Sequence, residues 1–198
     1  HIIIVPNAVI VPGNGPCDVE SSNWYAHVRD LLKENGLVAA AKNMPEPKNA
    51  YEHVWLPFIE NDLAGGAENL EHVVVIGHSS GAIAAMRLAE KRKIRGIILV
   101  AGYSSDLGYE SERVSGYFGD DGKRPWDWQK MCDNCGFIVQ FSSVDDRLVP
   151  IDEQRFVADQ LKAVAKEGQF EYIEMTGEDH FFSPCTKLDE VILERCKN

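Results

Sequence analysis

The fold is decided by residues 73–90, which read Val73-Val74-Val75-Ile76-Gly77-His78-Ser79-Ser80-Gly81, then Ala82-Ile83-Ala84-Ala85-Met86-Arg87-Leu88-Ala89-Glu90. The apolar run predicts a strand, the alanine-rich run predicts a helix, and a Gly-x-Ser-x-Gly turn joins them. In this context the motif is typical of a nucleophile elbow, a strained turn that presents the serine at the end of its strand. The two glycines lack the Cβ atoms that would crowd the neighbouring strand and helix. We therefore predict that Ser79 is a nucleophile rather than the serine of an ordinary glycine-flanked turn.

A nucleophilic serine needs a base, and the base needs a group that orients it. Behind an elbow of this kind the partners follow in the chain order serine, acid, histidine. Residues 169–175 predict the last strand, and His180 lies in the loop that follows it. A solvated loop histidine is the alternative, but His180 alone among the histidines has this placement. His78 is next to the serine, where its geometry is wrong for a base.

Two aspartates compete for the role of the acid, because Asp145 and Asp146 both follow the strand predicted at residues 137–141. Asp146 opens the sequence Asp-Arg-Leu-Val-Pro, and an acid before x-x-Val-Pro resembles the acid turn of many α/β-hydrolases. We favour Asp146, with Asp145 as a capping or supporting residue. The alternative is that both aspartates satisfy the backbone of a turn, as aspartate commonly does.

An acyl-transfer site also needs donors for the developing oxyanion. One is expected to be the backbone N–H of Ser80, the residue after the nucleophile. The second is expected from the glycine-rich turn at residues 12–15, which follows a strand at residues 8–11. We assign it to the N–H of Asn14, with Gly13 as the alternative. The turn lacks the lysine and the spacing of a phosphate-binding P-loop.

Length and composition fit one domain spanning residues 1–198, with 44% hydrophobic and 26% charged residues. The net charge of −11 argues against binding to nucleic acid or to an anionic membrane, since both need basic surface. No apolar stretch approaches the length of a membrane span. Residues 1–6 lack a basic segment and a clear cleavage site, so we expect no signal peptide there.

Five cysteines, at positions 17, 132, 135, 185 and 196, are an odd number at low density. This fits reduced thiols in a cytoplasmic protein better than a disulfide framework. Cys132 and Cys135 form a Cys-x-x-Cys pair, but a zinc site would want two further ligands nearby and a redox pair would want a thioredoxin-like setting. We interpret them as two ordinary thiols near a helix end, and we expect neither a metal nor another cofactor.

The rest of the chain alternates predicted strands and helices, which implies a mostly parallel sheet covered on both faces. Helices are expected at residues 22–35, 49–62, 153–166 and 188–196, and further strands at 37–41 and 94–101. Pro57 should kink or split its helix. The helix at 153–166 is expected to place Phe156, Val157, Leu161 and Val164 on one side. Sites in such sheets lie at the carboxyl ends of the strands, where all the candidate residues fall.

Residues 102–129 break the alternation and are rich in aromatic side chains. They could form a small rim or minimal lid over Ser79, with a second wall from the helix that contains Trp55. The alternative is that these aromatics pack the segment onto the domain, the commoner fate of large apolar side chains. The residues assigned to a substrate pocket are Trp55, Tyr117, Phe118, Trp126 and Phe181.

Nearly the whole chain, from about residue 8, resembles the retinoblastoma-binding protein 9 family of small serine hydrolases. The similar segments include Val-Pro-Gly-Asn-Gly at 11–15, Trp-Leu-Pro-Phe at 55–58, Ile-Gly-His-Ser-Ser-Gly-Ala-Ile-Ala-Ala-Met-Arg at 76–87, Ser-Gly-Tyr-Phe at 115–118 and Ile-Val-Gln-Phe at 138–141. The resemblance implies a three-layer α/β-hydrolase fold and a triad of Ser79, Asp146 and His180, which selects Asp146 over Asp145. It also implies activity on small esters or amides, including aminoacyl esters and amides.

The chain departs from the family in two places. The family binds retinoblastoma pocket proteins through a Leu-x-Cys-x-Glu motif, but residues 63–68 read Leu-Ala-Gly-Gly-Ala-Glu, without the cysteine. We therefore do not expect this partner. The loop at residues 118–124 is longer than expected for the family, so substrate preference near that edge should differ.

The resulting hypothesis is a metal-free serine hydrolase, carboxylesterase-like or aminopeptidase-like, that acts through an acyl-enzyme. A thioesterase or carboxylesterase for short acyl chains is the alternative among enzymes. A noncatalytic protein-binding module on a hydrolase scaffold is the alternative from another class, because a fold does not fix a function.

Overall fold

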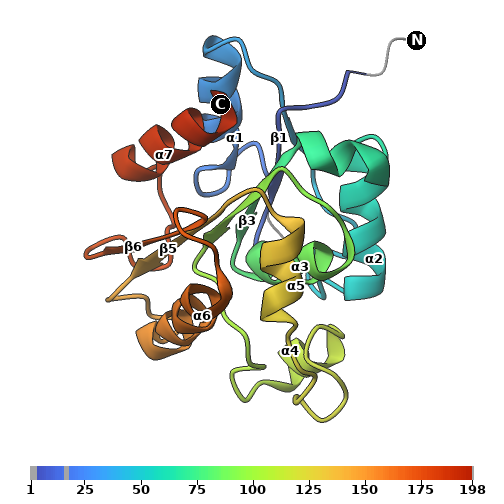
Figure 1. Ribbon diagram of the computed structural model, residues 1–198, viewed down its shortest axis with the longest axis vertical. Coiled ribbons are helices and arrows are strands. Elements are labelled where there is room, and N and C mark those ends of the chain that lie inside the picture. The colour runs from blue at the N-terminus through green and yellow to red at the C-terminus, as the bar shows by residue number, and fades with distance from the viewer. Residues whose placement is uncertain (1–3, 16–17, 198) are drawn as a thin grey trace.

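A parallel β-sheet forms the centre of the protein (Figure 1). The computed structural model describes residues 4–15 and 18–197. Within them, the sheet has six strands in the order β2-β1-β3-β4-β5-β6, and each neighbouring pair is parallel. The strands are β1 (Ala8–Val11), β2 (Ala39–Ala41), β3 (Val74–His78), β4 (Gly96–Val100), β5 (Ile138–Ser143) and β6 (Phe170–Met175).

Helices cover both faces of this sheet. On one face lie α1 (Tyr25–Glu34) and α7 (Thr186–Lys197), which pack in one hydrophobic cluster. The other face carries α2 (Glu52–Phe58), α3 (Ser80–Lys91), α5 (Trp128–Asn134) and α6 (Ile151–Val164), which share a second cluster. The short helix α4 (Glu110–Val114) lies in the segment between β4 and α5. The predicted three-layer architecture is confirmed.

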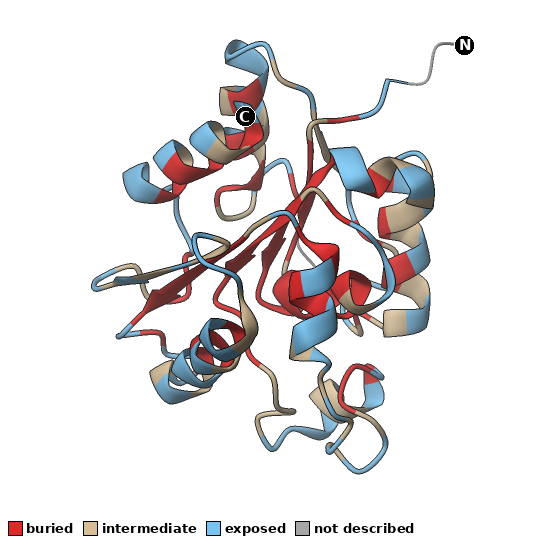
Figure 2. Ribbon diagram, viewed as in Figure 1, coloured by how far each residue is buried: buried red, intermediate tan, exposed pale blue. Residues whose placement is uncertain are grey.

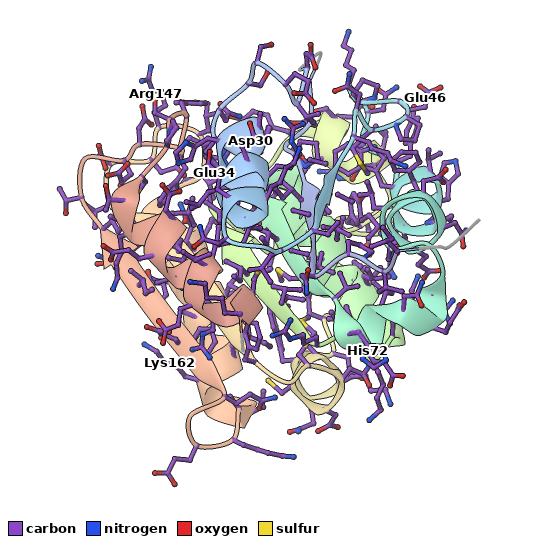
Figure 3. All side chains as sticks on the ribbon, turned by 90° about the horizontal axis from the view of Figure 1, so that it is seen from above. Asp30, Glu34, Glu46, His72, Arg147 and Lys162 are labelled. Carbon is purple, nitrogen blue, oxygen red and sulfur yellow. The ribbon has the colours of Figure 1, made fainter. Side chains whose placement is uncertain are left out.

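The central strands are apolar at nearly every position because both faces of the sheet are covered. Successive side chains point to opposite faces, so Val9 and Val75 pack against α2 and α3 while Ile10 and Ile76 pack against α1 and α7. Figure 2 shows these strands buried along their length. Charged side chains such as Glu46, Arg147 and Lys162 lie at the periphery of the molecule (Figure 3).

Pro57 interrupts its helix as predicted. The α-helix α2 ends at Phe58, one residue after the proline, and continues as a π-helical turn at Ile59–Leu63. Proline has no backbone N–H to donate to a carbonyl oxygen of the preceding turn, and this favours such a local rearrangement. A 3₁₀ turn at Ala67–His72 then leads into β3.

The apolar face predicted for α6 is partly wrong. Phe156 is 51% exposed, whereas Gln154 is fully buried. The buried positions are Gln154, Val157, Ala158 and Leu161, which follow the i, i+3, i+4, i+7 spacing of one helix face. Compared with the predicted face, the helix is rotated so that the side-chain amide of Gln154 lies beneath the sheet edge that carries the candidate site.

The strand order positions that site. Strands β2 and β3 lie on opposite sides of β1, so the order of strands reverses between β1 and β3. The loops that follow these two strands are neighbours at this point. Ligands of open parallel sheets bind at such points. The loops after β5 and β6 emerge at the same edge, because Ser143 pairs with Met175 at the ends of these strands.

Candidate active site

Ser79 lies in a strained turn between β3 and α3. Its backbone angles are φ 54° and ψ −117°, which a non-glycine residue rarely adopts. A Cβ on Gly81 would lie 2.1 Å from the carbonyl oxygen of Val11, and a Cβ on Gly77 would lie 2.3 Å from the carbonyl oxygen of Gly81. Both glycines are therefore required by the close packing of the turn against β1 and α3.

His180 and Asp146 form a buried pair beside this turn. The His180 Nδ1 atom lies 2.8 Å from one carboxylate oxygen of Asp146 and 3.0 Å from the other. The carboxylate also accepts hydrogen bonds from the N–H groups of Leu148 and Val149 at 2.9 Å and from the side-chain amide of Gln154 at 3.0 Å. These donors fix the carboxylate, and the carboxylate in turn fixes the imidazole ring.

Asp145 braces the loops instead of contacting His180. Its carboxylate accepts hydrogen bonds from the Ser143 hydroxyl at 2.6 Å and from the Gly177 N–H at 2.9 Å, which hold the pKa of Asp145 below its ordinary value. Arg147 adds an ion pair with Asp179. The loop after β6, which carries His180, is thus tied to the loop after β5.

Ser79 and His180 line one small cavity of about 120 Å³. Asn14 comes to it from the loop after β1, and Leu148 from the loop after β5. The complete lining is Gly13, Asn14, Asn23, Tyr25, His78, Ser79, Leu148, His180 and Phe182. The structure therefore brings together residues from the ends of β1, β3, β5 and β6, separated by up to 169 positions in the sequence.

The two expected oxyanion donors flank Ser79. Ser80 is the first residue of α3, where a backbone N–H has no intrahelical acceptor. A Cβ on Gly13 would lie 3.4 Å from the Ser79 Cβ, so the loop after β1 contacts the serine. The Gly13 N–H donates to the Tyr25 hydroxyl at 2.9 Å. Because Gly13 is engaged in this way, Asn14 is the stronger candidate of the two.

The structure corrects the aromatic pocket expected from the sequence. Trp55, Phe118 and Phe181 are buried in the hydrophobic core, and none of them lines the cavity at Ser79. Tyr117 is also buried and borders only a space of about 10 Å³ beside Ser80. Trp126 lines a separate open hollow with Trp128 and Phe156. Large apolar side chains gain more from core packing than from a place at a rim, and this explains the difference.

The segment at residues 102–129 is anchored by Arg87 of α3. The Arg87 side chain is 1% exposed and donates to the carbonyl oxygens of Tyr117 at 2.6 Å and Pro125 at 2.9 Å. Its guanidinium also lies 3.5 Å from the centre of the Trp126 ring and pairs with Glu90 at 2.7 Å. The aromatic side chains of this segment therefore pack it onto the domain, as the alternative interpretation expected.

Sequence reasoning missed Leu148, Phe182 and Gln154. Phe182 is 42% exposed and its ring lies 5.5 Å from that of His180, whereas the neighbouring Phe181 points into the core. The pattern of two adjacent phenylalanines marked the place but not which ring faces the cavity. Helical spacing with Val157 and Leu161 could have found Gln154.

The Cys132 and Cys135 side chains are buried near the end of α5, and burial raises the pKa of Cys135 to about 12. Cys17 lies outside the described residues. Within residues 4–15 and 18–197, no group of three or more histidine, cysteine, aspartate or glutamate side chains is arranged to hold a metal ion. In the same part of the chain, no helix combines the length and the apolar character needed to cross a membrane.

Comparison with known proteins identifies the family and the fold. The family model described as "Serine hydrolase" matches residues 8–173. The chain is 52% identical over 157 residues to "Serine hydrolase RBBP9" of Rattus norvegicus. The aligned residues cover 79% of this chain and 80% of that protein. The structure of the ydeN gene product from B. subtilis superposes with a TM-score of 0.76 at 21% identity, covering 96% of this chain and 98% of the other. A monoacylglycerol lipase from Paleococcus ferrophilus has a TM-score of 0.67 at 17% identity, with 97% and 95% covered. The fold is thus that of the α/β-hydrolases.

Proposed function

The chain belongs to the serine hydrolase family, and we propose that it hydrolyses small esters or amides through a triad of Ser79, His180 and Asp146. One observation carries the proposal. Ser79, in a strained turn, shares a cavity with His180, and a buried carboxylate orients the His180 ring. These are the parts that activate a serine hydroxyl in acyl transfer.

In the acylation step the Nε2 atom of His180 takes the proton from the Ser79 hydroxyl while the serine oxygen attacks the substrate carbonyl carbon. Asp146 accepts from the Nδ1–H of His180, which selects the tautomer with a free Nε2 and stabilises the imidazolium that forms. The N–H groups of Ser80 and Asn14 donate to the oxyanion. The tetrahedral intermediate then expels the alcohol or amine, which receives the proton held by His180, and an acyl-enzyme remains.

Deacylation repeats these steps with water. His180 takes a proton from the water molecule, the hydroxide oxygen attacks the acyl carbon, and the released serine oxygen takes the proton back from His180. The leaving group keeps the proton that came from Ser79, and Ser79 regains a proton from the water molecule, so the cycle ends with the site as it began.

The size of the cavity supports small acyl groups. At about 120 Å³ it is well below the roughly 300–1,000 Å³ of pockets for drug-sized ligands. Leu148 and Phe182 give it apolar walls, and both are partly exposed at its mouth. We therefore propose short or aromatic acyl esters, amino-acid esters and aminoacyl amides as the substrate class, and we expect lower activity on long acyl chains.

The proposal is tested by labelling the native protein with a fluorophosphonate probe and mapping the modified peptide. We expect stoichiometric label on Ser79 and none in Ser79→Ala. With a panel of p-nitrophenyl esters and aminoacyl amides, Ser79→Ala should lower kcat by about 10⁶-fold and Asp146→Asn by about 10⁴-fold.

Asp145→Asn is the matched control, because it makes the same chemical change one residue away. It should keep kcat within about threefold, since Asp145 supports loop contacts and does not touch His180. Absence of label on a folded protein would contradict the proposal and favour a noncatalytic binding module. Equal losses in the two asparagine variants would contradict the assignment of Asp146.

A further inference from the structure

A chain of buried hydrogen bonds runs beneath Ser79 through the neighbouring residue His78. His78 is the last residue of β3 and is 2% exposed. Its Nε2 atom lies 2.7 Å from the backbone carbonyl oxygen of His180, and its Nδ1 atom lies 2.7 Å from the Tyr25 hydroxyl. That hydroxyl accepts from the N–H of Gly13 at 2.9 Å and from the side-chain amide of Asn23 at 3.0 Å.

The direction of each bond in this chain follows from chemistry. A carbonyl oxygen can only accept, so the Nε2 of His78 must carry a hydrogen. Burial, reinforced by the neighbouring His180, lowers the pKa of His78 to about 3, so the imidazole is neutral and its Nδ1 atom is an acceptor. The Tyr25 hydroxyl therefore donates to Nδ1 while it accepts from Gly13 and Asn23. One tautomer satisfies all four of these hydrogen bonds.

The chain connects two loops that carry reacting groups. At one end it holds the backbone of His180, whose ring lies 5.1 Å from that of His78. At the other end it holds Gly13, which precedes Asn14 and lies against the Cβ of Ser79. The imidazole of His78 thus sets the separation between the loop after β1 and the loop after β6. The two loops do not follow neighbouring strands, since three strands lie between β1 and β6 in the sheet.

We propose that His78 is a positioning residue, a neutral imidazole that acts with Tyr25 to hold the base His180 and the oxyanion donor Asn14 in register with Ser79. It transfers no proton in the reaction. The inference rests on the proposed function, because it assigns His180 and Asn14 the roles given there.

The test compares three variants with the parent protein. Tyr25→Phe removes one oxygen and breaks the chain at its centre. His78→Gln places an amide near the position of Nε2, so it keeps a donor for the His180 carbonyl but loses the acceptor for Tyr25. Tyr172→Phe is the control, because it deletes a hydroxyl that donates to Glu174 on β6, away from the cavity.

The readout separates positioning from a purely structural role. We expect Tyr25→Phe and His78→Gln to lower kcat for a p-nitrophenyl ester by about 10- to 100-fold, with KM changed by less than about threefold. The affinity for phenylboronic acid, which forms a tetrahedral adduct with serine, should fall by a similar factor, because such analogues use the oxyanion donors. Tyr172→Phe should change neither quantity by more than about twofold.

Near-UV circular dichroism shows which variants are folded, and Tyr25→Phe decides the question if His78→Gln does not fold. A folded Tyr25→Phe variant with parental kcat and boronate affinity would overturn the proposal while leaving the triad intact. A parent protein that takes no fluorophosphonate label would overturn the proposed function, and the positioning role with it.

Discussion

Arg87→Met offers a quantitative test of how the segment at residues 102–129 is held. The substitution keeps the length and apolar stem of the side chain but removes the buried guanidinium. The carbonyl oxygens of Tyr117 and Pro125 then lose their donors, and the contact with the Trp126 ring is lost.

The size of the effect follows from those losses. Each buried carbonyl left without a donor costs about 1–3 kcal/mol. Glu90 keeps the hydrogen bond from the Asp127 N–H at 2.9 Å, which limits the cost of leaving its carboxylate unpaired. Breaking a buried ion pair by removing one partner typically costs about 3–5 kcal/mol, and we expect a value in that range. For a chain of this length, such a loss corresponds to a decrease in Tm of roughly 6–20 °C.

The assay is urea denaturation followed by circular dichroism, with Arg92→Met as the matched control. Arg92 directly follows the same helix, but its side chain is 47% exposed in its pair with Glu60, so its removal should cost less than about 1 kcal/mol. An Arg87→Met variant that loses no more stability than Arg92→Met would refute the reasoning.

Three further predictions concern the site and its frame. Gly81→Ala should abolish ester hydrolysis and lower the urea midpoint, because its Cβ would lie 2.1 Å from a backbone carbonyl oxygen of β1. Gly102→Ala is the control: its Cβ would make ordinary contact at 3.4 Å, and the free energy of unfolding should fall by less than about 1 kcal/mol. Phe182→Ala should lower kcat/KM for aromatic acyl esters with little change in Tm. Phe181→Ala should instead lower the free energy of unfolding by about 3–5 kcal/mol. The reverse pattern would show that Phe181, and not Phe182, faces the cavity. The pKa of His78 is about 3, against an ordinary 6.5, so between these pH values the unfolded chain binds a proton that the native state excludes. The free energy of unfolding should therefore fall as the pH is lowered from about 6.5 to about 3. This dependence on pH should be weaker in His78→Gln.

The elements most constrained by local chemistry were predictable from the sequence. The strands β1, β3 and β4 are apolar runs bounded by turn residues, and the Gly-x-Ser-x-Gly turn admits few conformations. Chain order then predicted the loops from which His180 and Asp146 come, and the structure brings these two residues within hydrogen-bonding distance. These inferences need only the periodicity of a segment and its place among the others.

Contacts between distant segments could not be predicted in this way. The tyrosine at position 25 and the histidine at position 78 meet because α1 packs on the sheet face beside β3, and no local pattern in either segment encodes that approach. The aromatic segment at 102–129 was ambiguous for a related reason. Composition identifies side chains that prefer burial, but the buried cation Arg87, which decides where they are buried, lies in another element.

The strain at Ser79 persists because its surroundings leave the turn no room to relax. Moving its backbone toward ordinary angles would shift Gly81, which already approaches the end of β1 as closely as a residue without a Cβ can. The Ser79 N–H is also held by the Val100 carbonyl at 2.9 Å, so β4 restrains the turn from the other side. The backbone of Ser79 and the N–H of Ser80 are therefore held in place before any substrate arrives. Electrostatic stabilisation of an oxyanion is strongest when its donors need no reorganisation. If Ser79 is the proposed nucleophile, the packing of β1 and β4 around the turn supports catalysis, and substitutions which loosen this packing should lower activity before they unfold the protein.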